Sequence, residues 1–170
     1  MERIITILLC VIAICASLTG CGAKPPVIIQ LDGGGISLSE SSDKRPVSEL
    51  QAKLKEVRLE NSDKPLFESV TITESKGIFY NSNRFLATVN PQETNTEVTL
   101  TVTMPGKPSG VRNGIIEEGK AHFPLSDYSE SSELAVEFEE NNIGVMIGII
   151  VVLVVIMAAF FIFMKRGRRI

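Results

Sequence analysis

Few side chains in this sequence are placed to perform catalysis. His122 is the only histidine, and no Gly-x-Ser-x-Gly elbow accompanies it, although a serine hydrolase of the α/β-hydrolase type would need one. Strand alternation around His122 places it on the face of a sheet, where a structural or surface histidine is much the commoner case. We therefore expect no enzyme, and a hydrolase that acts through His122 is the alternative.

Two further patterns could suit phosphate or a metal ion. Residues 32–35 read Asp-Gly-Gly-Gly, but no helix with Lys-Ser/Thr follows as it does in a phosphate-binding loop, so a hairpin turn is predicted. Two acidic clusters could hold a divalent cation, yet their spacing matches no known calcium loop. These clusters are Glu117-Glu118 and Glu137-x-Glu139-Glu140. We expect neither a bound metal nor a cofactor.

Cys21 is the residue with the most distinctive surroundings. Arg3 and an apolar stretch over residues 4–16 are typical of a secretory signal, and this stretch is short for a membrane span. The residues Leu18-Thr19-Gly20-Cys21 that follow resemble the lipobox of bacterial lipoproteins. The resemblance implies cleavage between Gly20 and Cys21 and a thioether-linked diacylglycerol on Cys21, whose new amino group could take a further acyl chain. The alternative is an ordinary signal peptide with an incidental thiol.

The cysteines and asparagines favour a bacterial origin. Cys10 and Cys15 lie within residues 1–20 and would be removed with the signal peptide, so Cys21 would be left without an internal disulfide partner. The chain also contains no Asn-x-Ser/Thr acceptor for glycosylation. Extracytoplasmic domains of eukaryotes commonly carry one or the other.

The second apolar segment, residues 143–164, predicts a transmembrane helix. At about 1.5 Å per residue it is long enough to cross a hydrocarbon core of about 30 Å. The basic tail at 165–170 follows directly and predicts a cytoplasmic C-terminus by the positive-inside rule. Gly144 and Gly148 have the spacing that lets two helices approach closely. The basic residues of the tail are Lys165, Arg166, Arg168 and Arg169.

A single extracytoplasmic domain is predicted between the two anchors, over residues 27–140, with a lipidated tether at 21–26. The whole chain has a net charge of −3, and this middle segment is more acidic still because four basic residues lie in the tail. Such a segment suits neither nucleic acid nor an anionic lipid surface as an electrostatic partner. Because a single apolar helix does not span a bacterial outer membrane, the plasma (inner) membrane is expected.

Hydrophobic periodicity predicts an α+β domain with a small antiparallel sheet and one amphipathic helix. The helix is expected to begin at Ser48 with Gln51 in a capping box, and to bury an apolar stripe that includes Leu50 and Leu54. Five to seven strands are expected, of which residues 97–104 and 134–138 alternate most clearly. Others are predicted at 27–31, 36–38, 67–73, 85–89 and 121–125. In 67–73, simple alternation places Phe67 on the face opposite to Val70.

A second resemblance covers residues 100–140. The segments "LTVTMPGKPSG", "NGIIEEGKAHFPLSD" and "SELAVEFEE", followed by the apolar helix, resemble the LppM-type bacterial lipoproteins. The resemblance implies a lipobox and a small α+β extracytoplasmic domain of an envelope or lipid-binding kind. His122-Phe123 stands where that family usually has an aromatic residue after its glycine turn.

These observations predict a doubly anchored, non-enzymatic membrane lipoprotein. Its domain would bind a partner close to the membrane, either a lipid or glycolipid head group or another envelope protein. The alternative function is that of an accessory subunit in a membrane complex, packed through the transmembrane helix.

Overall fold

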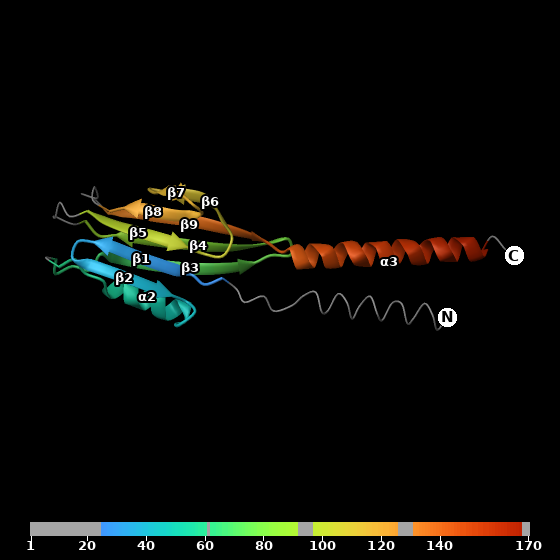
Figure 1. Ribbon diagram of the computed structural model, residues 1–170, viewed down its shortest axis with the longest axis horizontal. Helices are drawn as coiled ribbons and strands as arrows, with labels where there is room; N and C mark the ends of the chain where they lie inside the picture. The colour runs from blue at the N-terminus through green and yellow to red at the C-terminus, as the bar shows by residue number, and fades with distance from the viewer. Residues whose placement is uncertain (1–24, 61, 92–96, 126–130, 168–170) are drawn as a thin grey trace. The chain divides into compact units, whose positions relative to one another are not determined.

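The structure is a computed structural model that describes residues 25–60, 62–91, 97–125 and 131–167. The domain Lys24–Asn141 and the helix after it belong to separate compact units and are treated separately. Nine strands and two helices lie among the described residues (Figure 1). They are β1 (Ile28–Gly33), β2 (Ile36–Ser41), α2 (Val47–Glu56), β3 (Phe67–Lys76), β4 (Tyr80–Val89), β5 (Val98–Thr103), β6 (Lys107–Arg112), β7 (Ile115–Glu117), β8 (Lys120–Pro124), β9 (Ser132–Asn141) and α3 (Ile143–Gly167).

The strands form two antiparallel sheets. The five-stranded sheet has the order β2-β1-β5-β8-β7, and the four-stranded sheet has the order β3-β4-β9-β6. The α+β class is confirmed, but the expectation of one small sheet is wrong. Periodicity shows which face of a strand is buried and does not show which strands share a sheet. In Figure 1 the two sheets of the domain lie one over the other.

The core lies between the facing sheets. Phe85 of β4 and Phe123 of β8 are fully buried, and their ring centroids are 6.3 Å apart although the two residues belong to different sheets. The two most regular predicted strands contribute their apolar faces as expected. The buried residues of these strands are Val98, Leu100 and Val102 in β5 and Leu134, Val136 and Phe138 in β9.

Strands β6 and β7 were not predicted from the sequence. β6 contains Pro108 and Gly110, residues that normally break a strand, and its register with β9 shifts between them. This is tolerated because β6 lies at the edge of its sheet, where proline loses no ladder hydrogen bond. β7 is only three residues long and is also an edge strand.

Helix α2 closes one side of the domain. It begins at Val47 after Pro46, and no side chain caps it, so the predicted capping box of Ser48 and Gln51 is wrong. The Gln51 side chain instead donates a hydrogen bond of 3.1 Å to the carbonyl oxygen of Ile72 in β3. The predicted apolar stripe is confirmed because Leu50 and Leu54 are buried.

A register shift in β3 corrects the predicted alternation. Phe67 and Val70 are both buried, although a regular strand would place them on opposite faces. The pairing with β4 shifts between Phe67 and Ser69, which leaves Glu68 as an extra residue in the manner of a β-bulge. The bulge turns Phe67 back into the core.

The hairpin turn predicted at residues 32–35 is confirmed. Gly33 pairs with Ile36, so Gly34 and Gly35 form a two-residue turn between β1 and β2. Their φ angles are 61° and 77°, which matches a type I′ turn and favours glycine at both positions. β2 continues to Ser41, beyond the predicted end at residue 38.

Candidate functional site

The outer face of the five-stranded sheet carries polar side chains on β1, β2 and β5, most of them uncharged. Because β1 and β5 bury alternate residues and the apolar residues of β2 are partly buried, the intervening residues of these three strands point away from the core. They surround a shallow hollow of about 310 Å³. Its polar lining residues are Gln30, Asp32, Ser37, Ser39, Thr99 and Thr101.

Strand register arranges these residues in two rows across the sheet. Gln30 lies between Ser39 and Thr101, its partners on the two neighbouring strands. Asp32 in the same way has Ser37 on one side and Thr99 on the other. Gln30 is therefore at the centre of a surface with hydroxyl groups on both sides.

His122 extends the row that contains Gln30. It pairs with Thr101 in the register of β5 and β8, and its Nδ1 is 3.0 Å from the Thr101 hydroxyl oxygen. A hydroxyl next to an imidazole is the start of a nucleophile and base pair, but such a base needs a third group to orient it. Within the part of the chain that the structure describes, the His122 ring has Thr101 as its only hydrogen-bond partner.

The chemistry available in the hollow is mainly hydrogen bonding by neutral groups. A glutamine amide supplies two donors and an acceptor, and each serine or threonine hydroxyl can donate and accept. Within the described part of the chain, Asp32 is the one ionisable group that lines the hollow. This set suits a ligand that presents several hydroxyl groups and little charge.

The outer face of the four-stranded sheet is different because it carries charges of both signs. Register places Arg84 opposite Glu137 and Lys107 opposite Glu139. Ser82 also donates a hydrogen bond to the Glu137 carboxylate. Such mixed, solvated charge ladders are ordinary protein surface, so this face is a weaker candidate for a ligand site.

The acidic clusters that could have held a cation are dispersed in the structure. Glu117 pairs with Lys120 across the β7–β8 turn, and Glu118 occupies that turn with a φ of 50°. Glu137 and Glu139 lie on the charged face of β9, and Glu140 pairs with Asn81. Within the described ranges, no three carboxylate, histidine or cysteine side chains are gathered for a metal ion.

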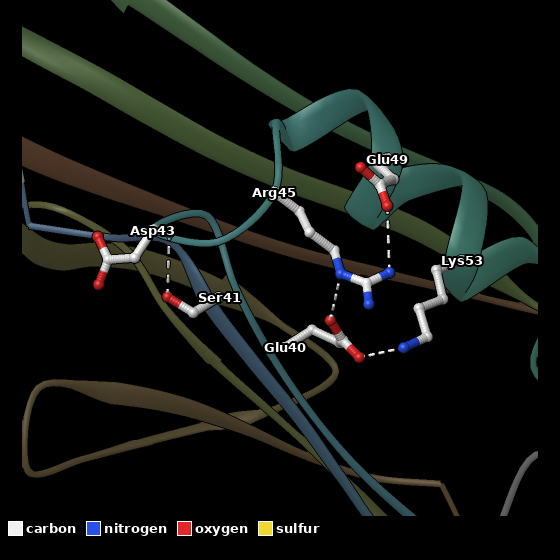
Figure 2. Close-up of polar contacts among 6 residues, drawn as sticks. All are labelled: Glu40, Ser41, Asp43, Arg45, Glu49 and Lys53. Atoms are coloured by element: carbon white, nitrogen blue, oxygen red, sulfur yellow. Dashed lines mark hydrogen bonds and ion pairs between the residues drawn. The ribbon is translucent and has the colours of Figure 1, made fainter.

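A separate charged cluster, made of Glu40, Arg45, Glu49 and Lys53, has a structural role (Figure 2). Glu40 of β2 accepts from Lys53 of α2, and its second oxygen is 3.5 Å from Nε of Arg45. The hydrogen bond from Lys53 is the main cause of a lowered pKa at Glu40. Since α2 also bonds to β3 through Gln51, the helix links the edge strands of the two sheets.

The residues predicted for membrane attachment belong to the other unit or lie outside the description. Gly144 and Gly148 are in the first turns of α3, and a side chain added at either would meet no atom within 4 Å. Lys165 and Arg166 are in its last turn. Gly20, Cys21, Arg168 and Arg169 lie outside the described residues.

The hollow was missed in the sequence because its members are ordinary strand residues. Thr99 and Thr101 show only the alternation of a half-buried strand. Their meeting with Gln30 depends on β1 lying between β2 and β5, and no local pattern reports that order.

Comparison with the models of known protein families, with curated proteins and with solved structures finds no match to this chain. The fold defines an α+β protein of two antiparallel sheets. Among the described residues, one helix is long and apolar enough to span a membrane, over Ile143–Phe161.

Proposed function

We propose that this chain is a membrane-anchored, non-enzymatic lipoprotein whose domain binds a hydroxyl-rich glycolipid head group. The observation that carries the proposal is the hollow on the outer face of the five-stranded sheet, where Gln30 lies between hydroxyl side chains of two neighbouring strands. A sugar presents many donors and acceptors and no charge, and this lining complements it. An envelope protein is the competing ligand.

The ends of the domain support attachment to one membrane at two points. β1 starts beside the end of β5, because Ile28 pairs with Thr103. The turn after β5 approaches the end of β9, since a Cβ on Gly106 would lie 2.5 Å from the Glu139 backbone. The chain therefore enters and leaves the domain at the same end.

The tether to the proposed lipid is short. Cys21 precedes Ile28 by about seven residues, which span at most about 25 Å when extended. A diacylglycerol on Cys21 and a bilayer-spanning α3 would hold the domain close to the lipid head groups. The expected orientation has the domain outside the plasma membrane and Lys165, Arg166, Arg168 and Arg169 inside.

Glycolipid retention tests the binding site. Full-length protein in detergent micelles is incubated with a diglycosyl diacylglycerol or with phosphatidylglycerol, and bound lipid is counted by native mass spectrometry. Wild type should retain the glycolipid preferentially. Gln30→Ala combined with Thr101→Ala should weaken retention by about tenfold or more, because each lost hydrogen bond contributes about 0.5–1.5 kcal/mol.

The matched control is Thr71→Ala, which removes an exposed hydroxyl from β3, on the other sheet. It should retain the glycolipid like wild type. Unchanged retention in the Gln30 and Thr101 double variant would show that the hollow is not the site. Equal retention of the two lipids by wild type would exclude a glycolipid and favour a protein ligand.

Fatty-acid labelling tests the anchor independently. Cells that express wild type should incorporate radiolabelled palmitate into the protein, and the Cys21→Ser variant should not. That variant should also retain residues 1–20 and stay in the membrane fraction through α3. Equal labelling of the two proteins would refute the lipobox interpretation.

A second candidate function is packing of α3 against another membrane protein. The space around Gly144 and Gly148 supports it, because neither position is covered within the part of the chain that the structure describes. Replacing residues 143–164 by an unrelated apolar span separates the two functions. Head-group binding by the domain should survive the exchange, whereas assembly through the helix should be lost.

A further inference from the structure

Three consecutive apolar residues are exposed at the turn between β3 and β4. Ile78, Phe79 and Tyr80 are 65%, 57% and 55% exposed. The other large apolar side chains exposed in the described part of the domain are Ile115 and Ile116, on the short edge strand β7. An exposed group of this kind commonly marks a contact with another molecule or with lipid.

The turn holds these side chains at its tip. Lys76 pairs with Asn81, and the N–H of Gly77 donates a hydrogen bond of 3.0 Å to the carbonyl oxygen of Tyr80. A side chain at Gly77 would come within 2.4 Å of that oxygen, so the closed turn requires glycine there. Ile78 and Phe79 occupy the two positions between the hydrogen-bonded ends.

The backbone does not require apolar residues at this position. The two other two-residue hairpin turns among the described strands contain Gly34-Gly35 and Glu118-Gly119, so each of them includes glycine, which turns commonly use. At the β3–β4 tip, burial cannot explain the apolar pair either, because both side chains are exposed.

The hairpin tip lies beside the point where the chain leaves the domain for α3. Tyr80 pairs with Asn141 in the register of β4 and β9, which places their Cα atoms about 5 Å apart. Ile143, the first residue of α3, follows Asn141 after two peptide steps, a distance of at most about 7 Å. This proximity is set by the covalent chain and does not depend on the direction of α3.

We propose that the β3–β4 hairpin tip is a third attachment to the membrane, with Ile78 and Phe79 inserted at the boundary between head groups and acyl chains. The proposal rests on the proposed role of α3 as the membrane span. A helix that enters the hydrocarbon at Ile143 brings the tip to a depth of about 5–10 Å in the interface, where apolar and aromatic side chains partition.

The residues next to the tip fit this depth. Tyr80 combines an apolar ring with a hydroxyl, the combination that is enriched at the membrane surface. Lys76 is exposed at the base of the hairpin and can meet lipid phosphates. Glu140 lies opposite Asn81, and its charge favours keeping the end of β9 in the aqueous layer. Insertion is thus limited to the tip.

Tryptophan fluorescence provides the test because the chain contains no tryptophan. Three single-tryptophan variants of the full-length protein, Phe79→Trp, Ile115→Trp and Leu153→Trp, are reconstituted into phosphatidylcholine and phosphatidylglycerol vesicles with and without dibrominated acyl chains. Ile115 is the matched control, since it is similarly exposed but pairs with His122, away from the hairpin. Leu153 reports on α3.

Insertion of the tip predicts blue-shifted emission of the Phe79→Trp variant and several-fold stronger quenching by brominated lipid than for Ile115→Trp. The inference is overturned if the Phe79→Trp and Ile115→Trp variants are quenched equally weakly while Leu153→Trp is quenched strongly. Blue-shifted but unquenched emission from Phe79→Trp overturns it as well, in favour of a protein contact. If Leu153→Trp is also unquenched, α3 does not span the bilayer and both proposals fail.

Discussion

The contact between Phe85 and Phe123 gives the most direct test of the two-sheet architecture. The rings belong to different sheets, are fully buried and lie 6.3 Å apart with a tilt of 35°. Replacing both by alanine would cost about 3–5 kcal/mol each, which is comparable to the whole stability of a small domain, about 5–15 kcal/mol. Leucine is the better substitution because it keeps most of the apolar volume.

The expected magnitudes follow from the contact. Phe85→Leu and Phe123→Leu should each destabilise the domain by about 1–2 kcal/mol, through lost apolar burial and imperfect repacking. The double variant should cost less than the sum, by about 0.5–1.5 kcal/mol, because the first substitution already removes the ring–ring contact. The measurement is a double-mutant cycle by urea unfolding of the full-length protein in micelles, followed by far-ultraviolet circular dichroism.

The control pair is Phe85→Leu with Leu50→Ala. Leu50 is a buried residue of α2 but does not belong to the central cluster that contains Phe85, so these two effects should add within about 0.5 kcal/mol. If the destabilising effects of Phe85→Leu and Phe123→Leu also add within about 0.5 kcal/mol, the packing of the two sheets against each other is refuted.

Three further predictions concern single residues. The pKa of Glu40 is lowered from its ordinary value of 4.5, so the stabilising effect of its carboxylate should be complete above pH 4.5 and lost as the pH falls through the lowered pKa. The melting temperature of Glu40→Gln should therefore fall less steeply with acidification than that of wild type. Equal slopes of melting temperature against pH would contradict this. Asn83→Ala should destabilise the domain by about 1–3 kcal/mol in urea unfolding, because the Asn83 side chain is buried and donates a hydrogen bond of 3.1 Å to the carbonyl oxygen of Pro105. A buried hydrogen bond contributes about 1 kcal/mol, so a change below about 0.5 kcal/mol would contradict this contact. Gly33→Ala should lower the melting temperature by several degrees, since the φ of Gly33 is 107° and the added Cβ would lie 2.2 Å from a backbone oxygen. The control is Gly110→Ala, whose added Cβ meets no atom within 4 Å. Equal melting temperatures of the two variants would rule out the close approach at Gly33.

Local sequence patterns determined much of the secondary structure. Alternation in residues 98–103 and 134–138 requires only that one face of each strand be buried, and the structure buries the expected residues. The apolar stripe of α2 and the glycine turn at Gly34 and Gly35 are equally local, because side-chain spacing and φ angles decide them. Two local details, the bulge at Glu68 and the uncapped start of α2 after Pro46, differ from what side-chain spacing alone predicts.

The candidate site and the hairpin contact depend on the tertiary structure. Gln30 and Thr101 are far apart in the chain and meet because β1 pairs with β5. Tyr80 lies next to Asn141 because β4 pairs with β9. The chain alone identified the apolar segment that became α3, since twenty or so apolar residues are enough to predict a span. Strand order is set by how all the apolar faces can be buried at once, and that is a property of the whole domain.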